Sequence, residues 1–488
     1  MDAEPRAAWL TRAELAGVAA MVVVAVAAWL AFPVAPTYDS LYSLVWGREI
    51  LDGAAPGFAD FGAPTQHPLW VAASTLLALF GDAGARAMTL VAVLSFVVLL
   101  AATYYLGRTV FGPLAGALAA ALLLTRLNFG FYAAFAFVDM PFAALVMAAA
   151  ALEAARPRRG QIVWALLVLA GLLRPEGWVF AAAYGACLWG GADTRGRLRI
   201  LAWVALAPVL WALSDLAATG DPLFSWTYTT GEAGRLGRQR TWDETPQAFW
   251  SALAELLKPP LALVGGLGVA LVLARRRSRR SAAIALALLA VGAATFAIVV
   301  LGGVSGQVPR YASIAAVALL LFAGNLVAEL VRPRAGAGAR AARVAAIALI
   351  LAGGVWTASR LHPGSITSLL GFRYDVEQDL DAVLHADAVR RARRCGPVAI
   401  PTHKLTPLVR WQLDLPRESV VARNDPEAEQ FGTPGAVLLV RAKRLIRDPG
   451  YGPFGQQGAG NSPVAAQAPP EGYAHRGRTR FFEIYTRC

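Results

Sequence analysis

The chain carries little charge for its length. Asp, Glu, Lys and Arg make up 16% of its 488 residues, whereas about a quarter is usual in soluble proteins. Only 3 residues are cysteine, too few for a disulfide framework. No internal repeat is visible, which disfavours transporters built from inverted repeats. The composition therefore disfavours an ordinary soluble enzyme and excludes a disulfide-rich secreted scaffold.

Apolar residues take the place of the missing charge. They make up 57% of the chain, and Ala/Leu/Val runs of about 20 residues, enough to cross a bilayer, recur between 15 and 359. The formal net charge is +13, but the basic residues form short clusters between the apolar runs. This pattern orients a membrane protein and does not indicate a nucleic-acid partner. The sequence predicts a polytopic membrane protein in contact with membrane lipids.

Eleven transmembrane spans are expected. They lie at about 15–33, 85–107, 110–125, 139–155, 161–173, 176–191, 200–218, 259–274, 281–303, 311–331 and 344–359. A further apolar run at 68–80 is short for a span, and we interpret it as an interfacial helix. With it in the interface, the basic clusters at 156–159, 195–199 and 275–280 all face the cytoplasm, as the positive-inside rule favours. This places the N-terminus inside and the C-terminus outside.

The remainder of the chain differs in kind from the apolar part. It has ordinary charge and three β-type runs at 398–402, 436–440 and 481–486. The predicted fold is an all-α membrane domain over 1–359, with interfacial helices in the first outer loop, and a small extracytoplasmic α/β domain over 360–488. Antiparallel pairing of the first and last runs would place Cys395 and Cys488 at the same end, so we expect a disulfide between them.

Carboxylates collect at the outer ends of the expected spans. Asp39 and Asp139 each lie near a helix start, where an anion is favoured. Each is either a helix-capping residue or part of a site, and His67, which precedes a proline, is either structural or a ligand. Few charges lie in the middle of the spans, where an ion-coupled carrier would place them. The pattern indicates chemistry at the outer membrane face.

Several short motifs follow one another in a fixed order. They are Asp39, Asp52-Gly53, His67-Pro68-Leu69-Trp70, Phe80-Gly81 with Arg86, Tyr105-Leu106-Gly107-Arg108, Phe111-Gly112, Asp139-Met140-Pro141, Arg174-Pro175-Glu176-Gly177 and Arg310-Tyr311. Their order and spacing resemble the GT-C superfamily of integral-membrane glycosyltransferases, which use polyprenyl-phosphate sugars. The resemblance covers 34–191 by motif and the rest by architecture. The Arg-Pro-Glu-Gly and His-Pro-Leu-Trp segments resemble the actinobacterial arabinofuranosyl- and mannosyltransferase branches.

The resemblance implies an inverting transfer at the outer face of a bacterial plasma membrane. A sugar would move from a polyprenyl-phosphate donor to a cell-envelope glycan, glycolipid or glycoprotein, with Asp39 as the general base and Asp139 as a second catalytic carboxylate. The donor phosphate would meet Arg310 first and Arg174 second. The remaining substrate contacts would come from Tyr38, Tyr42, His67, Glu176, Tyr311 and Trp226. The sugar stays open, with mannose and arabinofuranose first.

Several alternatives remain open at the level of sequence. The Arg174 and Glu176 side chains could form an ion pair that fixes a hairpin, and Trp226 could belong to an interfacial aromatic belt. No metal is expected by default, but His67 with Asp39 or Asp139 could hold a divalent ion; many relatives have an acidic pair where this chain has Tyr-Asp-Ser. A lipid-linked sugar transporter and a non-catalytic glycan-binding protein are the alternative functions.

Overall fold

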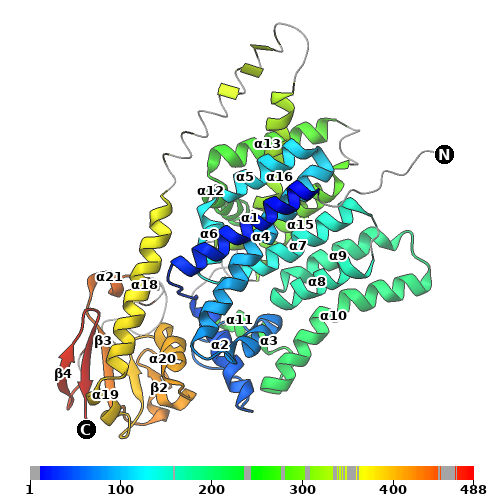
Figure 1. Ribbon diagram of the computed structural model, residues 1–488. Coiled ribbons are helices and arrows are strands. Elements are labelled where there is room, and N and C mark those ends of the chain that lie inside the picture. The colour runs from blue at the N-terminus through cyan, green and yellow to red at the C-terminus, as the bar shows by residue number, and fades with distance from the viewer. Residues whose placement is uncertain are drawn as a thin grey trace.

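The computed structural model describes residues 11–157, 160–235, 243–275, 281–302, 308–332, 362–448 and 470–488, together with 451, 468 and single positions between 338 and 359. Within these residues the chain is mostly helical and has a five-stranded sheet near the C-terminus. Figure 1 shows the sheet and its helices beside a larger helical bundle. We call residues 363–488 the C-terminal unit.

The elements follow the apolar pattern of the sequence. The bundle contains α1 (Arg12–Ala31), α2 (Tyr38–Leu51), α3 (Pro68–Ala78), α4 (Ala83–Phe111), α5 (Pro113–Leu124), α6 (Leu127–Ala134), α7 (Asp139–Ala155), α8 (Gln161–Leu173), α9 (Glu176–Trp189), α10 (Thr194–Thr219), α11 (Phe224–Arg235), α12 (Thr245–Leu257), α13 (Pro259–Ala274), α15 (Ala283–Leu301), the 3-10 helix η1 (Pro309–Ala312) and α16 (Ser313–Val331). The C-terminal unit contains α18 (Pro363–Leu384), α19 (Asp387–Ala392), β1 (Val398–Ile400), η2 (His403–Leu405), α20 (Thr406–Leu413), η3 (Arg417–Ser419), β2 (Val420–Ala422), η4 (Ala428–Phe431), β3 (Ala436–Val440), α21 (Lys443–Ile446), β4 (Ala474–Arg478) and β5 (Phe482–Thr486).

Ten of the eleven predicted spans coincide with helices, and the other, 344–359, falls mostly outside the described residues. In the described chain, five helices are long and apolar enough to cross a membrane, or up to seven if each of two bent pairs is one span. Several others are short, such as α8 with 13 residues, against the ~20 that cross a bilayer core. The structure is thus compatible with a multi-pass membrane protein, and eleven spans are not confirmed.

Two expected outer loops contain helices. The segment at 124–139 contains α6, which bends by 63° from α5, and the segment at 219–258 contains α11 and α12. Helix α12 turns by 109° into α13. The break falls at Lys258, which has a positive φ of 67°, directly before Pro259. Proline cannot continue a helix but suits the first turn of a new one.

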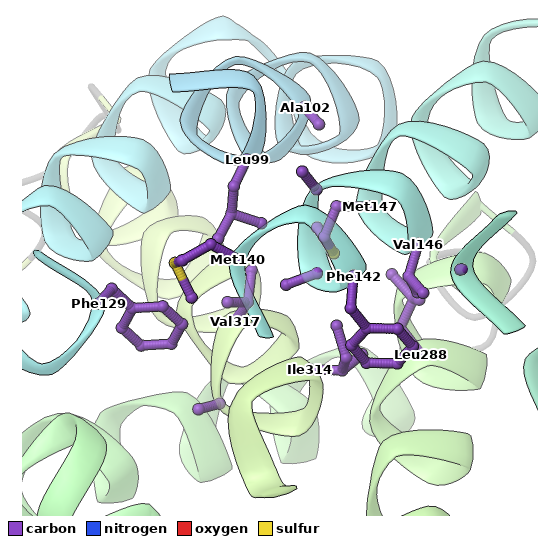
Figure 2. Close-up of a cluster of buried hydrophobic side chains, with 14 of the residues drawn as sticks. Leu99, Ala102, Phe129, Met140, Phe142, Val146, Met147, Leu288, Ile314 and Val317 are labelled. Atoms are coloured by element: carbon purple, nitrogen blue, oxygen red, sulfur yellow. The ribbon is translucent and has the colours of Figure 1, made fainter. Parts of the chain in front are cut away.

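The centre of the bundle is apolar and closely packed. Figure 2 shows side chains of α4, α6, α7, α15 and α16 packed together, among them Phe129, Met140, Leu288 and Val317. Helix α16 is buried along most of its length. Since η1 directly precedes α16, the position of η1 is set by the core of the bundle.

Glycines let three of these helices approach closely. A Cβ on Gly107 of α4 would lie 2.7 Å from the Cα of Gly116 in α5. A Cβ on Gly324 of α16 would lie 2.5 Å from the carbonyl oxygen of Ala115. Larger side chains would push the helices apart, so small residues here set the spacing of α4, α5 and α16, as is common between membrane helices.

The C-terminal unit is built on a mixed sheet with the strand order β2-β1-β3-β5-β4. Strands β2, β1 and β3 are parallel, and β5 runs antiparallel to both β3 and β4. The expected direct pairing of 398–402 with 481–486 is therefore wrong, because β3 lies between β1 and β5. The opposite strand directions still bring Cys395 and Cys488 to the same end of the sheet, where a disulfide joins them.

An ion-paired seam attaches the C-terminal unit to the bundle. Arg410 of α20 is 1% exposed and pairs with Glu49 of α2 and, at 3.0 Å, with Asp60. Arg48 of α2 donates to the carbonyl oxygens of Arg410, at 2.6 Å, and Trp411, at 3.1 Å. We call Arg410, Glu49 and Asp60 the docking triad. These contacts fix the C-terminal end of α2, the helix whose first turn carries Asp39.

Candidate active site

Most of the predicted site residues lie at the beginnings of helices. Asp39 is in the first turn of α2, Asp139 begins α7, and Glu176 begins α9. Arg310 lies in η1, directly before α16. The structure brings these side chains together from helices that are distant in the chain, and places anionic groups at the positive ends of helix dipoles.

Neither Asp39 nor Asp139 caps its helix. The N-cap of α2 is Thr37, whose side chain accepts from the backbone N–H of Ser40. Helix α7 follows Val138, and no side chain caps it. The capping alternative is therefore wrong for both residues, and their carboxylates are directed to other partners.

Arg174, Asp139 and Glu176 form a buried ion network. Arg174 Nη1 lies 2.7 Å from Asp139 Oδ1, and Arg174 Nη2 lies 2.6 Å from Glu176 Oε1. All three side chains are less than a tenth exposed. Both carboxylates neutralise this guanidinium, so Arg174 fixes the α8–α9 hairpin and orients Asp139. This arrangement is the ion pair weighed for the Arg-Pro-Glu-Gly motif, extended by a third residue.

The hairpin itself depends on close backbone contact. A Cβ on Gly177 would lie 2.5 Å from the backbone nitrogen of Gly171, so the first turn of α9 packs directly on the last turns of α8. The backbone N–H of Gly177 donates to the carbonyl oxygen of Arg174 at 2.9 Å. The Arg-Pro-Glu-Gly sequence thus forms a tight turn that presents two charged side chains to one point.

Arg310 lies between the two catalytic candidates without a close bond to either. Its Nη2 is 3.7 Å from Asp39 Oδ2, and its Nε is 3.9 Å from Asp139 Oδ2. Both the Arg310 Nε and the Asp139 Oδ2 are buried and have no hydrogen-bond partner. A buried unpaired donor is costly, so this guanidinium retains hydrogen-bonding capacity that an anionic ligand can use.

Aromatic rings hold the two arginines in place. Tyr311 packs under both, 4.8 Å from the Arg174 guanidinium and 5.7 Å from that of Arg310. Phe137 lies 5.2 Å from the Arg310 guanidinium. Cation–π contacts of this kind stabilise a cation without occupying its N–H groups. Tyr311 is thus a supporting residue that leaves the donors of Arg310 directed toward the carboxylates.

The space at the buried side of this cluster is small. A cavity of about 10 Å³ is lined by Asp139, Phe142, Arg174, Glu176, Thr295, Arg310, Tyr311, Ser313 and Ile314. It has room for about one water molecule. The side chain of Asp39 is 34% exposed and that of Arg310 is 22% exposed, while Asp139 is at 3%. Among these described side chains, Asp39 is therefore the carboxylate that a substrate can reach.

Two of the expected substrate contacts pack in an aromatic cluster beside Asp39. Tyr38 donates to the carbonyl oxygen of Gly62 and makes an edge contact with Tyr42 at 5.0 Å. Tyr42 is fully buried with Trp46 and Phe58. These tyrosines anchor the start of α2, and Tyr42 presents no surface to a substrate.

His67 and Trp226 occupy different surroundings. His67 is half-buried before α3, and its Nδ1 has no hydrogen-bond partner. Burial, with the nearby charges of Arg174 and Arg310, lowers the pKa of His67 to about 3, so the imidazole is neutral. Trp226 is 66% exposed on α11, in keeping with the interfacial-belt alternative.

The carboxylates of the cluster are directed at arginines. Asp139 and Glu176 bind Arg174, and Asp39 faces Arg310. In the part of the chain that the structure describes, no group of three or more His, Cys, Asp or Glu side chains is placed to hold a metal ion. With their carboxylates facing guanidinium groups, Asp39, Asp139 and Glu176 are not arranged as a ligand set for a divalent cation.

Sequence reasoning did not identify every residue of the site. Ser313, whose buried hydroxyl has no hydrogen-bond partner, and Thr295 both line the small cavity. Both lie within apolar runs and belong to no motif, so no local pattern marks them. No protein-family model and no curated protein matches the chain. The site is therefore interpreted from its own geometry.

Proposed function

We propose that the protein is an integral-membrane glycosyltransferase that moves a sugar from a polyprenyl phosphate to a cell-envelope acceptor, with inversion at the anomeric carbon. The observation that supports it most is the pair of Asp39 and Arg310. An accessible carboxylate lies 3.7 Å from a guanidinium whose Nε has no hydrogen-bond partner. A base and an anion-binding group at this separation suit a displacement in which phosphate leaves.

The residues would act in one step. The acceptor hydroxyl oxygen attacks the anomeric carbon, its proton passes to a carboxylate oxygen of Asp39, and the bond from that carbon to the phosphate oxygen breaks. The electron pair leaves with the phosphate, whose charge Arg310 stabilises. Asp139, held by Arg174, positions Arg310 in this step. Because one base attacks opposite one leaving group, the configuration inverts.

The proposed topology places this chemistry at the outer face. Eleven spans, a cytoplasmic N-terminus and an extracytoplasmic C-terminal unit agree with the basic clusters of the sequence. In a background with Cys187→Ala, Asp82→Cys should react with a membrane-impermeant maleimide added to intact cells, and Pro157→Cys should not. Labelling of position 157 alone would overturn the topology.

The test of the activity is sugar transfer by the lipid-reconstituted protein. A panel of polyprenyl-phosphate sugars is offered with a mixed cell-envelope acceptor extract, for the wild type, Asp39→Asn and Asp52→Asn. Asp52 ends the same helix and is exposed, so it is the matched control. We expect one donor to be consumed, and Asp39→Asn to lower transfer about 10²- to 10⁴-fold, the usual contribution of a general base.

Two other outcomes would contradict the proposal. If no donor is consumed while a lipid-linked sugar crosses the membrane of proteoliposomes, the protein is a transporter. If the protein binds cell-envelope glycan, consumes no donor and is unaffected by Asp39→Asn, it is a non-catalytic binding protein. The buried network around Arg174 then has only a structural role.

A further inference from the structure

Helix α1 is joined to α4 by polar contacts near both of its ends. Near the C-terminal end, Trp29 Nε1 donates to the carbonyl oxygen of Arg86 at 2.9 Å, and Arg86 Nη2 donates to that of Trp29 at 2.8 Å. Near the N-terminal end, Arg108 Nη1 lies 2.6 Å from Glu14 Oε2. None of the 20 residues of α1, all of which the structure describes, is buried. Helix α1 thus lies on the outside of the bundle and is tied to α4 at two separated points.

An apolar cavity of about 560 Å³ lies between these two contacts, lined by α1, α4 and α7. Its volume is in the range of small-molecule sites. Val18 and Val22 line it from α1, and Ala148, Ala151 and Ala155 line it from α7. The three alanines recur at helical spacing and share one face of α7, where their small side chains do not reach α1. The sequence of α7 therefore leaves this space open.

The cavity is about as long as one leaflet of a membrane. Along α4 its lining runs from Leu94 to Tyr105, a rise of ~16 Å. The hydrocarbon core of a bilayer is ~30 Å thick, so one leaflet occupies about half of that. Apart from Tyr105 and Arg156, every lining residue is Ala, Val or Leu, and an apolar cavity stays dry and takes up apolar ligands. This length and this lining suit one lipid acyl chain.

A positive charge lies at one end of the cavity. Arg156, which lines this end, directly follows the last residue of α7 and is exposed. No described carboxylate forms an ion pair with it, because Glu14 is paired with Arg108 and Glu153 accepts from Tyr184 of α9. Arg156 therefore offers its charge to a ligand, and it matches the phosphate of an anionic lipid headgroup.

We infer that this cavity binds an anionic phospholipid, with one acyl chain between α1, α4 and α7 and the headgroup phosphate at Arg156. The site is separate from the candidate active site, because Asp139 begins α7 and Arg156 follows its end, ~25 Å away along the helix. In the proposed topology this end faces the cytoplasm, where anionic lipids attract basic residues. The inference does not depend on the proposed activity.

The test counts bound lipid on the full-length protein by native mass spectrometry. Delipidated protein in detergent is titrated with phosphatidylglycerol, with phosphatidylcholine of the same acyl chains, and with glycerophosphoglycerol, which is the headgroup without chains. Val22→Phe fills the cavity from α1, and Val23→Phe is its matched control, since Val23 is 67% exposed and does not line the cavity. Arg156→Gln removes the charge, and Arg195→Gln, exposed in the first turn of α10, is its control.

We expect the wild type to bind one phosphatidylglycerol about 5-fold more tightly than phosphatidylcholine, the usual contribution of one basic residue at a membrane surface. Val22→Phe should weaken binding of both lipids about 10-fold, the loss when about two methylene groups are no longer buried. Arg156→Gln should remove only the preference for phosphatidylglycerol. Both controls should behave as the wild type, and glycerophosphoglycerol should not bind.

Ala148→Leu fills the same cavity from α7 and gives a second, independent reading, with thermal unfolding in the absence of lipid as the check on the fold of each variant. If phosphatidylglycerol binds both filled variants as tightly as the wild type, the lipid lies elsewhere and the inference falls. If Arg195→Gln removes the preference as fully as Arg156→Gln does, the headgroup assignment falls. Glycerophosphoglycerol binding as tight as that of phosphatidylglycerol would also overturn the inference, since the acyl chains would then contribute nothing.

Discussion

Arg410 and Arg310 each lie between two carboxylates, one in the docking triad and the other in the candidate active site. Arg410 is 1% exposed, and each of its three nitrogens has a partner: Glu49, Asp60 at 3.0 Å and the carbonyl oxygen of Leu415 at 3.2 Å. Arg310 is 22% exposed, stays 3.7 to 3.9 Å from its carboxylates, and has a buried Nε without a hydrogen bond.

The hydrogen bonding of the guanidinium thus distinguishes a structural ion pair from a candidate binding group, although both consist of an arginine and two carboxylates. An arginine whose three nitrogens are all hydrogen-bonded within the protein must break a bond to take up a ligand there, and its removal takes a positive charge away from buried carboxylates. An arginine whose donors are held apart from its neighbours can bind an anion without first breaking a bond. Substitution of the first kind of arginine should therefore lower stability, and substitution of the second kind should lower activity.

The largest effect is expected at Arg310. Arg310→Gln should lower sugar transfer about 10²- to 10³-fold, the loss typical for one donor that stabilises transition-state charge. The temperature of thermal unfolding should stay within a few degrees of the wild type, because Arg310 makes no hydrogen bond to its two carboxylates, which lie 3.7 and 3.9 Å away. Donor-consumption assays and differential scanning fluorimetry on the same preparations check both parts. A large fall in the unfolding temperature would remove the contrast with Arg410.

Arg410→Gln should have the opposite profile. Breaking a buried pair by removing one partner costs about 3 to 5 kcal/mol, so the C-terminal unit should detach or unfold more readily. Limited proteolysis and hydrogen exchange of α20 and β2 measure this. Combining Arg410→Met with Glu49→Gln and Asp60→Asn should recover part of the stability, because no carboxylate is then left unpaired. If the single substitution leaves exchange unchanged, the docking triad does not hold the seam.

Removal of the disulfide tests the stability of the C-terminal unit apart from the strength of its docking to the bundle. Cys395 and Cys488 are 93 residues apart in the chain, and a native disulfide typically contributes about 2 to 4 kcal/mol. Cys395→Ser with Cys488→Ser should raise hydrogen exchange throughout the sheet, while α2 and the charged cluster of the bundle stay protected. Equal loosening of both regions would show that sheet and bundle unfold as one unit.

Much of the fold could be predicted because its causes are local. Apolar runs and prolines define α7, the α8–α9 hairpin and α13, and each boundary depends on residues within one or two turns. Three of the five strands, β1, β3 and β5, were also predicted, since alternation and β-branched residues act locally, whereas β2 and β4 were not. That β3 lies beside β1 was not predicted, because strand order depends on contacts between distant segments.

The sequence indicated which residues could form the candidate site, but not the distances between them. The motifs place Asp39, Asp139 and Arg310 at helix starts, whereas the distances among them depend on how α2, α7 and α16 pack. His403 lies in no motif, and only the docking of the C-terminal unit seats its ring on Tyr38, beside Asp39. Contacts between the bundle and the C-terminal unit therefore had to come from the structure.

The smallest effect is expected where a carboxylate has no arginine at hydrogen-bond distance. Glu377 of α18 accepts from the Tyr451 hydroxyl at 2.9 Å, and burial raises the pKa of Glu377 to about 7, against 4.5 for an ordinary glutamate. The folded unit thus holds this proton more tightly than the unfolded chain. Stability from this group is complete below pH 4.5 and is lost as the pH rises through 7, by at most about 1.4 kcal/mol per pH unit.

Glu377→Gln should remove this slope, since the amide keeps an acceptor for Tyr451 and does not ionise. Hydrogen exchange of α18 and the sheet, followed between pH 5 and 8 with correction for intrinsic rates, should show a pH-dependent loss of protection in the wild type and a flat profile in the variant. Glu483, which is paired with Arg441, supplies the control substitution Glu483→Gln, expected to keep the wild-type slope. A wild-type profile without slope would mean that a tyrosine hydroxyl stabilises a buried carboxylate as well as Arg410 of the docking triad does.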